Sequence, residues 1–141
     1  MPYKFLEDIS LADVAFEASG KNLEELFESS ALATTNVMIK NLSAIKPKVK
    51  KKLKLKANTI ENLLHEFLQE LVFLKDAKQL VFSKYKIKVN EKKVELVAEI
   101  FGEKLNPKTQ VHMVDVKAVT WHQYEVEKTD KGWKARVILD I

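Results

Sequence analysis

The last six residues, RVILDI (136–141), decide how the rest of this chain can fold. Four of them are apolar and suited to a buried strand: Val137, Ile138, Leu139 and Ile141. Terminal residues are usually disordered unless packing holds them. The sequence therefore predicts an ordered final strand, in which Asp140 and the carboxylate of Ile141 lie next to each other on a rigid element.

The composition is that of a folded protein without cysteine chemistry. The chain has 141 residues, of which 46% are hydrophobic and 31% charged, and it contains three glycines and three prolines. This is enough for one domain spanning residues 1–141 around a single core. The absence of cysteine excludes disulfides and thiolate metal sites. Neither a signal peptide nor an apolar run of about 18 residues is present, so a cytoplasmic protein without a membrane partner is expected.

Two amphipathic helices are predicted. The first runs from about Asn22 to Met38, where Asn22 and Glu25 have the spacing of a capping box. The second is predicted to begin with Asn58 as its N-cap and Glu61 three residues later. Its apolar residues from Ile60 to Val72 form a broad face that could cover a sheet.

The remaining segments read as strands. The stretch ADVAFEA (12–18) alternates with a period of two, and residues 79–90 and 92–101 form a predicted hairpin around Asn90-Glu91. Residues 111–128 and 133–141 form a second hairpin around the turn TDKGW. This order of elements predicts an α+β fold, a two-layer sandwich of two helices on a mixed, largely antiparallel sheet.

The second hairpin also predicts a register. If it turns on Asp130-Lys131, paired residue numbers sum to 261, and Asp140 lies opposite Trp121. Lys117 would then share the face of Asp140, just beyond the chain end. A three-residue turn with a left-handed Gly132 is the alternative, and it would move Lys117 to the other face.

A lysine segment, KPKVKKKLKLK (46–56), accounts for the net positive charge of the chain. It holds seven lysines and no acid, whereas the whole chain has a net charge of +4. Lys50, Lys52, Lys54 and Lys56 fall on the outward face of a strand. A solvated face is the favoured interpretation. The alternative is a direct RNA-binding or RNA-chaperone module that contacts phosphates, or docking on an acidic partner, although no aromatic residue interleaves within the segment.

Nothing in the sequence predicts an independent enzyme. Three glycines cannot build a phosphate-binding loop, and no Ser-His-Asp arrangement is recognisable. His65, His112 and His122 lack the spacing of metal ligands and are interpreted as structural residues.

Acidic groups offer one site. If the fold brings Asp13 beside Asp140 and the Ile141 carboxylate, three anionic oxygen groups converge and repel one another. A hard divalent cation would relieve that repulsion, because Ca²⁺ and Mg²⁺ prefer oxygen ligands. A solvated terminal charge at Asp140 and a purely structural calcium-binding protein remain alternatives.

Several segments together resemble the archease family. They are ADV, ASGKNLEELFESSALA, NLLHEFLQELVFLKD, GEKLNP and the close DVKAVTWHQYEVEK…GWKARVILDI. The resemblance implies a non-catalytic activator of the GTP-dependent tRNA-splicing ligase, which promotes guanylylation of the ligase and its multiple turnover. The tRNA would be involved indirectly, with weak direct contact through Lys50, Lys52, Lys54 and Lys56 as an option.

The resemblance also implies which residues act. The family's metal ligands correspond to Asp13, Asp140 and Ile141, with Ca²⁺ expected first and Mg²⁺ or Mn²⁺ as alternatives; the lysine of its VKA motif corresponds to Lys117. One departure is clear, because the family pattern His-Thr-Ala-Asp-x-Gly reads here as residues 10–15, SLADVA. Ser10 and Ala15 replace the usual histidine and glycine, which implies altered metal affinity or altered coupling to the ligase.

Overall fold

The computed structural model describes the backbone of residues 2–10 and 13–141. Side chains are described for residues 2–6 and 13–141. The described helices are α1 (Leu23–Met38), α2 (Ile60–Lys78) and a short 3₁₀ helix, η1 (Leu42–Ala44). The described strands are β1 (Tyr3–Ser10), β2 (Asp13–Gly20), β3 (Val49–Lys56), β4 (Leu80–Asn90), β5 (Glu95–Lys104), β6 (Ala118–Val119), β7 (Glu125–Thr129) and β8 (Gly132–Asp140).

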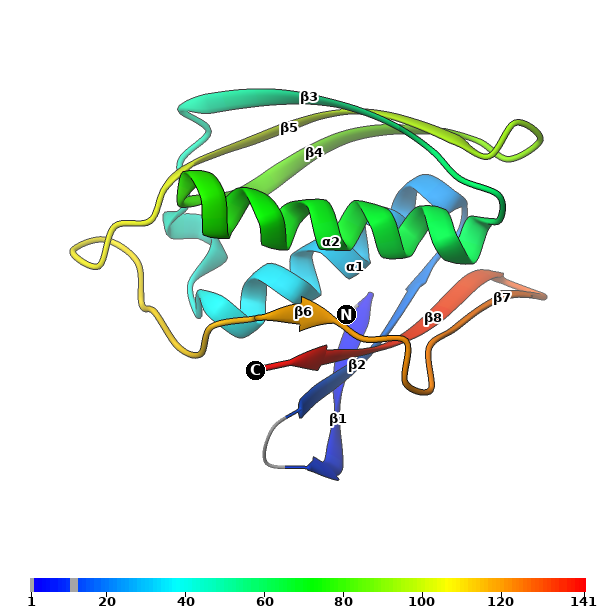
Figure 1. Cartoon of the computed structure of the whole chain (residues 1–141), viewed down its shortest axis with the longest axis horizontal. Helices are drawn as coiled ribbons and strands as arrows, with labels where there is room; N and C mark the ends of the chain where they lie inside the picture. Colours follow the sequence, from blue (N-terminus) through cyan, green and yellow to red (C-terminus); the bar gives the residue numbers. More distant parts are fainter. Residues whose placement is uncertain (1, 11–12) are drawn as a thin grey trace.

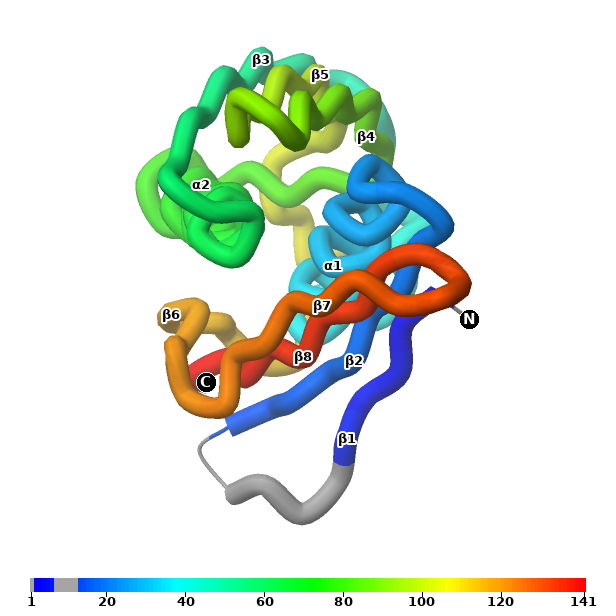
Figure 2. Tube along the Cα trace, turned by 90° about the vertical axis from the view of Figure 1, so that its right-hand side faces the viewer, coloured from blue at the N-terminus to red at the C-terminus, as the bar shows by residue number. Residues whose placement is uncertain are grey.

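The strands form two sheets, and the helices lie between them (Figures 1 and 2). One sheet has the order β1-β2-β8-β6, with β7 also paired to β8, and the other has the order β3-β5-β4. All described strand pairs are antiparallel. The predicted α+β class is confirmed, but the predicted single mixed sheet in two layers is wrong. Because each helix contacts strands of both sheets, each buries apolar residues on two sides.

Side-chain caps fix where the helices begin. The Asn22 side chain accepts a hydrogen bond from the Glu25 amide at 2.9 Å, and Glu25 accepts one from the Lys21 amide at 3.0 Å. In α2 the cap is Thr59, whose hydroxyl oxygen accepts from the Asn62 amide at 3.1 Å. The predicted N-cap Asn58 is therefore wrong by one residue, because Thr59 has the three-residue spacing to the amide that it caps.

The hairpins follow the predicted order with different bounds. Strands β4 and β5 pair from Asn90 to Glu95, so their turn has four residues, 91–94. Strands β7 and β8 turn on Asp130-Lys131 and pair Thr129 with Gly132, whose φ of 138° favours glycine. Residues 111–117, predicted as strand, instead form a connecting segment with an isolated bridge at His112.

Strand β1 is an addition that the sequence analysis did not predict. It pairs with β2 at the edge of the larger sheet and carries an irregularity between Leu6 and Ser10. Its residues lack a clean alternation of apolar and polar types, which explains why the period-two signal missed it.

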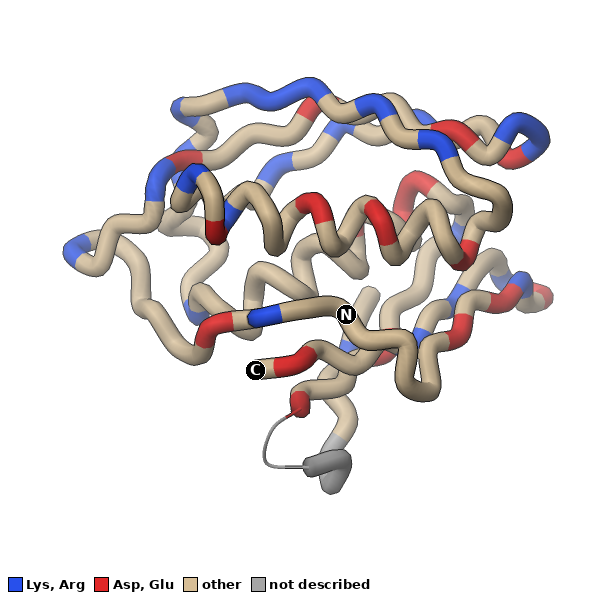
Figure 3. The backbone as a smooth tube through the Cα atoms, viewed as in Figure 1, with Lys and Arg blue, Asp and Glu red and all other residues tan. Residues whose placement is uncertain are grey.

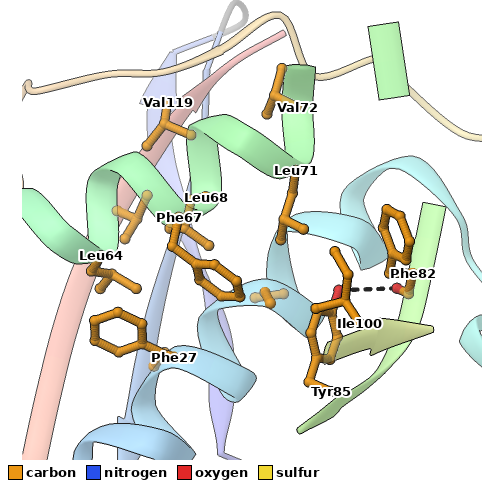
Figure 4. Close-up of a cluster of buried hydrophobic side chains, with 14 of the residues drawn as sticks. Phe27, Leu64, Phe67, Leu68, Leu71, Val72, Phe82, Tyr85, Ile100 and Val119 are labelled. Carbon is orange, nitrogen blue, oxygen red and sulfur yellow. Dashed lines mark hydrogen bonds between the residues drawn. The ribbon is translucent and has the colours of Figure 1, made fainter. Parts of the chain in front are cut away.

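The core joins all three layers (Figure 4). The Phe27 and Phe67 rings stack with their centroids 5.8 Å apart, which links α1 to α2. Tyr85 of β4 packs edge-on against Phe67 and donates its hydroxyl hydrogen bond to the Phe82 carbonyl at 3.1 Å. Val119 of β6 approaches the same cluster from the opposite sheet. One helix therefore holds the two sheets together through its side chains.

The burial of α2 predicts a sharp contrast between two of its phenylalanines. Replacing Phe67 by alanine should lower the free energy of unfolding by about 3–5 kcal/mol, because it leaves a cavity between the layers. Phe73 on the same helix is 55% exposed, so Phe73→Ala should cost less than about 1 kcal/mol. Urea unfolding of both variants measures the difference. Equal losses would contradict this account of the core.

Candidate functional site

Asp13 and Asp140 face each other across two neighbouring strands. Strands β2 and β8 pair antiparallel, with Asp13 opposite Asp140 at the first step of the register. Directly opposed residues share a face and have Cβ atoms about 4.5–5.5 Å apart. Both side chains are half-buried. The fold thus brings an acid from near the start of the chain to its penultimate residue.

Ile141 is held in place from two sides. Its half-buried side chain packs against the core, and the preceding carbonyl of Asp140 accepts a hydrogen bond from the Lys117 amide at 2.8 Å. The end of the chain therefore lies against β6 and is ordered (Figure 1).

The donor set suits a hard cation. Among the described residues no group of three or more His, Cys, Asp or Glu side chains could hold a metal ion. The predicted cluster does not depend on three such side chains, because it consists of two side-chain carboxylates and the Ile141 carboxylate. Directly opposed like charges are unfavourable in a sheet, and a divalent cation bound between them would offset that cost. The residues fit such an ion, and the predicted metal site stays a prediction.

The predicted register is right for one strand and wrong for the next. Pairs from Glu125↔Arg136 to Thr129↔Gly132 sum to 261, as predicted. Between β7 and β6 the chain makes a turn at Trp121–Tyr124, in which Gln123 has a φ of 49°. Beyond this turn the sum is 258, so Ala118 and not Trp121 lies opposite Asp140.

This change of register moves Lys117. Since Ala118 occupies the position opposite Asp140, the ladder does not give Lys117 the face of Asp140, contrary to the prediction. Lys117 nevertheless remains at the chain end through its backbone hydrogen bond to Asp140, and its side chain is exposed. The backbone of Lys117 therefore lies beside Asp140 at the chain end.

A buried lysine on α2 fixes the segment that carries Lys117. The Lys75 ammonium group is bonded to the carboxylates of Asp76 and Asp115 and donates to the Val116 carbonyl at 2.8 Å, although the residue is only 5% exposed. Burial alone would lower the pKa of Lys75. The hydrogen bonds and negative charges of Asp115 and Asp76 outweigh burial and raise that pKa above its ordinary value. Lys75 is therefore charged and anchors residues 115–116.

Two further α2 side chains hold strand β6. The Gln69 side-chain oxygen accepts from the Val119 amide at 3.0 Å, and His65 Nε2 donates to the Val119 carbonyl at 2.8 Å. The His65 ring also stacks on Trp121, with centroids 3.6 Å apart. Both backbone polar groups of Val119 are thus bonded to α2, which holds the edge strand β6 against the helix.

This anchoring set was not predicted from the sequence, although the position of Lys75 is a signal for it. Lys75 lies four residues after Leu71 and three after Val72, on the apolar stripe of α2. A lysine at such a position must find a partner when it is buried. Its acidic partner Asp115 is 40 residues away, so sequence spacing could not identify it.

The histidines behave as structural residues where contacts are described. His65 is bonded to the backbone as above, and His112 Nε2 lies 3.1 Å from the Gln110 side-chain oxygen. His122 is exposed on the turn before β7. None of the described histidines belongs to a potential metal cluster.

The lysine segment forms a strand with the predicted alternation. In β3, Lys50, Lys52, Lys54 and Lys56 are exposed, while Val49, Lys51, Leu53 and Leu55 are half-buried. The strand lies at the edge of the smaller sheet, far from Asp140 in the layer order (Figure 1). Across the described residues, no helix is long and apolar enough to cross a membrane.

Comparison with solved structures places this arrangement of layers in a known fold. The solution structure of protein 1598 from Methanobacterium thermoautotrophicum is 35% identical and covers 99% of both chains, with a TM-score of 0.84. A crystal structure from Thermotoga maritima, described as an archease and possible chaperone, has the same fold at a TM-score of 0.66. It is 22% identical and covers 96% of this chain and 97% of that one.

Sequence comparison identifies the family. The model of the Archease protein family (MTH1598/TM1083) matches residues 3–141. "Protein archease" from Methanosarcina barkeri is 37% identical over 142 residues, which cover 99% of this chain and 95% of that protein. "Protein archease" from Pyrococcus furiosus is 36% identical over 133 residues, covering 92% and 93%. The chain belongs to the archease family.

His65 gives a pH prediction for this site. Burial lowers the pKa of His65, and its hydrogen bonds to the Val119 and Thr120 backbone offset this only in part. In the unfolded chain a histidine titrates near pH 6.5. As the pH falls below about 6.5, the unfolded state therefore gains a proton that the folded state resists, and the free energy of unfolding decreases.

The test is His65→Gln, which keeps an amide donor for Val119 and removes the titration. Its free energy of unfolding in urea should depend less on pH between about 5 and 6.5 than that of the wild type. The control His122→Gln removes an exposed histidine and should keep the wild-type dependence. An unchanged slope in His65→Gln would refute the assignment.

Proposed function

We propose that this protein is a non-catalytic activator of the GTP-dependent tRNA-splicing ligase, acting through the chain-end cluster of Asp13, Asp140 and the Ile141 carboxylate. The observation that carries the proposal is the direct pairing of Asp13 with Asp140 in a member of the archease family. The resemblance of the motifs assigns ligand roles to these same residues. Two independent arguments therefore support the same site.

The cluster is a site for one divalent cation, with Ca²⁺ favoured over Mg²⁺ and Mn²⁺. Three carboxylates supply hard oxygen donors, and a flexible set with several carboxylate oxygens suits the variable coordination of Ca²⁺. When bound, the cation would stabilise the negative charge that develops on nearby phosphate oxygens during guanylylation. Asp13 and Asp140 hold their positions through the β2–β8 ladder, and Ile141 holds its position by packing against the core.

Lys117 adds a movable positive charge beside this site. The Lys117 backbone is fixed by its hydrogen bond to the Asp140 carbonyl, and Lys75 anchors the two preceding residues, Asp115 and Val116. A lysine ammonium on a flexible stem can contact a phosphate oxygen of the ligase's nucleotide. The proposed role of Lys117 is to orient that phosphate and not to react with it.

Exposed apolar residues flank Lys117 along the chain and suit contact with a protein partner. Met113 and Val114 precede it, and Trp121 follows it at 58% exposure. Aromatic residues and methionine are enriched in protein interfaces. Their position on the segment that carries Lys117 supports docking of the ligase around the cluster.

The family's missing histidine bears on the same site. Ser10, which stands at that position, pairs with Asp13 in the β1–β2 ladder. Its side chain lies outside the described side chains. A residue paired with a ligand can orient it, so position 10 is expected to tune the affinity for the cation.

The ligase assay with paired variants tests the proposal. Asp13→Asn and Asp140→Asn should each abolish stimulation of ligase guanylylation, because each removes an anionic ligand while keeping the side-chain volume. The control Asp130→Asn changes an exposed acid on the β7–β8 turn and should keep full stimulation. Adding one glycine after Ile141 displaces the terminal carboxylate and should also abolish stimulation of the ligase. Normal multiple-turnover ligation with Asp140→Asn would exclude the proposed mechanism.

A further inference from the structure

Two strands contribute lysines to the same outer face of the smaller sheet. Strand β5 lies between β3 and β4, and its neighbours pair with it in register. Lys50 and Lys84 both pair with Phe101, Lys52 and Lys86 with Glu99, and Lys54 and Lys88 with Val97. Since directly paired residues share a face, these lysines form two parallel rows. Together with Lys56 they are here called the lysine face.

The geometry of the rows is regular. Alternate residues along a strand are about 6.8 Å apart, and two strands separated by a third are about 9.6 Å apart. All seven lysines are exposed, because the helices cover the opposite side of the sheet. Figure 3 shows the basic positions gathered along β3 and β4. The sequence pattern identified only the β3 row, because the β4 row lies some 30 residues further along the chain and only the fold brings the two rows to one face.

The lysine face holds more positive charge than the chain as a whole. Seven lysines and the two glutamates Glu95 and Glu99 of β5 give +7 − 2 = +5, against +4 for the full sequence. The Glu99 carboxylate forms an ion pair with the Lys50 ammonium group at 3.4 Å, and the Glu95 carboxylate forms one with the Lys56 ammonium group at 3.5 Å. Within the described part of the chain, the other five lysines of this face form no ion pair: Lys52, Lys54, Lys84, Lys86 and Lys88.

The outer face of the larger sheet shows what an ordinary solvated face looks like in this protein. There the charges of both signs are interleaved and paired. Lys134 lies 3.9 Å from both Glu17 and Glu127, and Arg136 lies 3.1 Å from Glu125. Protection of sheet edges requires charge, but it does not require one sign. The excess of positive charge over β3 and β4, which Glu95 and Glu99 offset only in part, therefore favours an anionic ligand.

The side chains between the two lysine rows come from β5, where Val97 and Phe101 lie on either side of Glu99. Phe101 is half-buried, with the ammonium groups of Lys84 and Lys86 5.4 and 5.6 Å from its ring centroid. Val97 is 51% exposed on the same strand. A depression of about 530 Å³ on this sheet is lined by Lys52, Lys86, Ile87, Lys88, Val97, Ala98 and Glu99. The face thus offers cations on both sides of two apolar side chains, Val97 and Phe101, with Glu99 between them.

We propose that the lysine face binds the backbone of a single-stranded nucleic acid. The phosphates contact the two lysine rows, and the bases lie on the apolar side chains of Val97 and Phe101. A polymer of anionic groups that also carries flat apolar groups matches both features, whereas an acidic protein surface would not need the apolar side chains. One aromatic ring and no arginine provide little base readout, so binding follows charge and not sequence. This inference does not depend on the ligase proposal.

The test measures fluorescence anisotropy of a labelled oligouridylate as a function of salt. Five lysines without an internal partner, each releasing a counterion, give a slope of about −3.5 in log affinity against log salt. Affinity should therefore fall on the order of 10²-fold between about 50 and 200 mM salt. The variant Lys52→Gln/Lys54→Gln/Lys86→Gln/Lys88→Gln should reduce the slope to about −0.7 and weaken binding at least tenfold at the lower salt concentration.

A charge-matched variant is the control. It replaces four exposed lysines outside the face by glutamine, and these are Lys40, Lys78, Lys108 and Lys131. It should keep the wild-type affinity and slope, and both variants should keep the wild-type melting temperature because their substitutions are on the surface. Equal weakening by the two variants would overturn the proposal, since it would show a response to net charge alone.

Three further arms decide the ligand class. Oligodeoxythymidylate binding as tightly as oligouridylate supports recognition through phosphate alone, and tighter RNA binding supports an added 2′-hydroxyl contact. Tighter binding of a duplex of equal length would overturn the single-strand assignment. In a further outcome, the lysine-face variant binds both single-stranded oligonucleotides as tightly as the wild type does and binds the ligase at least tenfold more weakly. In that case the face is a site for an acidic protein, and the proposal fails.

Discussion

The pairing of β2 with β8 is the constraint on which the structure depends. It joins residues 13–20 to residues 133–140 over eight consecutive pairs, so the largest sheet cannot form before nearly the whole chain is present. Such a contact carries the greatest loop-closure cost in the molecule. The buried residues Phe16, Val137 and Leu139 of this pair supply the apolar contact that offsets it. The acidic pair at the end of the ladder is a consequence of the same register.

The position of the helices between two sheets explains why the molecule has two unlike outer surfaces. Both helices contact both sheets, so the inner faces of all the long strands are used for the core. Most charged residues on those strands point outward, with the half-buried Lys51 of β3 as an exception. The two outer faces can then differ without affecting packing. On the larger sheet the charges are mixed and paired, whereas on the smaller sheet they are mostly lysine (Figure 3).

Local sequence signals predicted the elements well, and long-range geometry poorly. The Asn22 cap and the alternation of Lys50 to Lys56 depend on neighbours within a few residues, and both were predicted correctly. The Asp130-Lys131 turn was one of two alternatives that the sequence allowed. The position of Lys117 depends on a turn at Trp121–Tyr124 that changes the register by three, and no glycine or proline marks it. The division into two sheets depends on burial of both sides of each helix, which periodicity alone does not specify. Lys75 and Asp115 could be paired only once the chain was folded.

The placement of the two proposed sites has a functional consequence. The chain-end cluster belongs to the sheet of β2, β8 and β6, and the lysine face belongs to β3, β5 and β4, with α1 and α2 between them (Figure 2). The two sites therefore lie on the outer surfaces of different sheets. The α2 helix contacts strands of both sheets, because His65, Gln69 and Lys75 hold β6 and its approach segment while Phe67 packs against Tyr85 of β4. The α1 helix contacts both sheets as well. Coupling between a protein partner at the chain end and a polynucleotide on the lysine face would pass through this helical layer, and it would be a free energy shared equally by the two binding reactions.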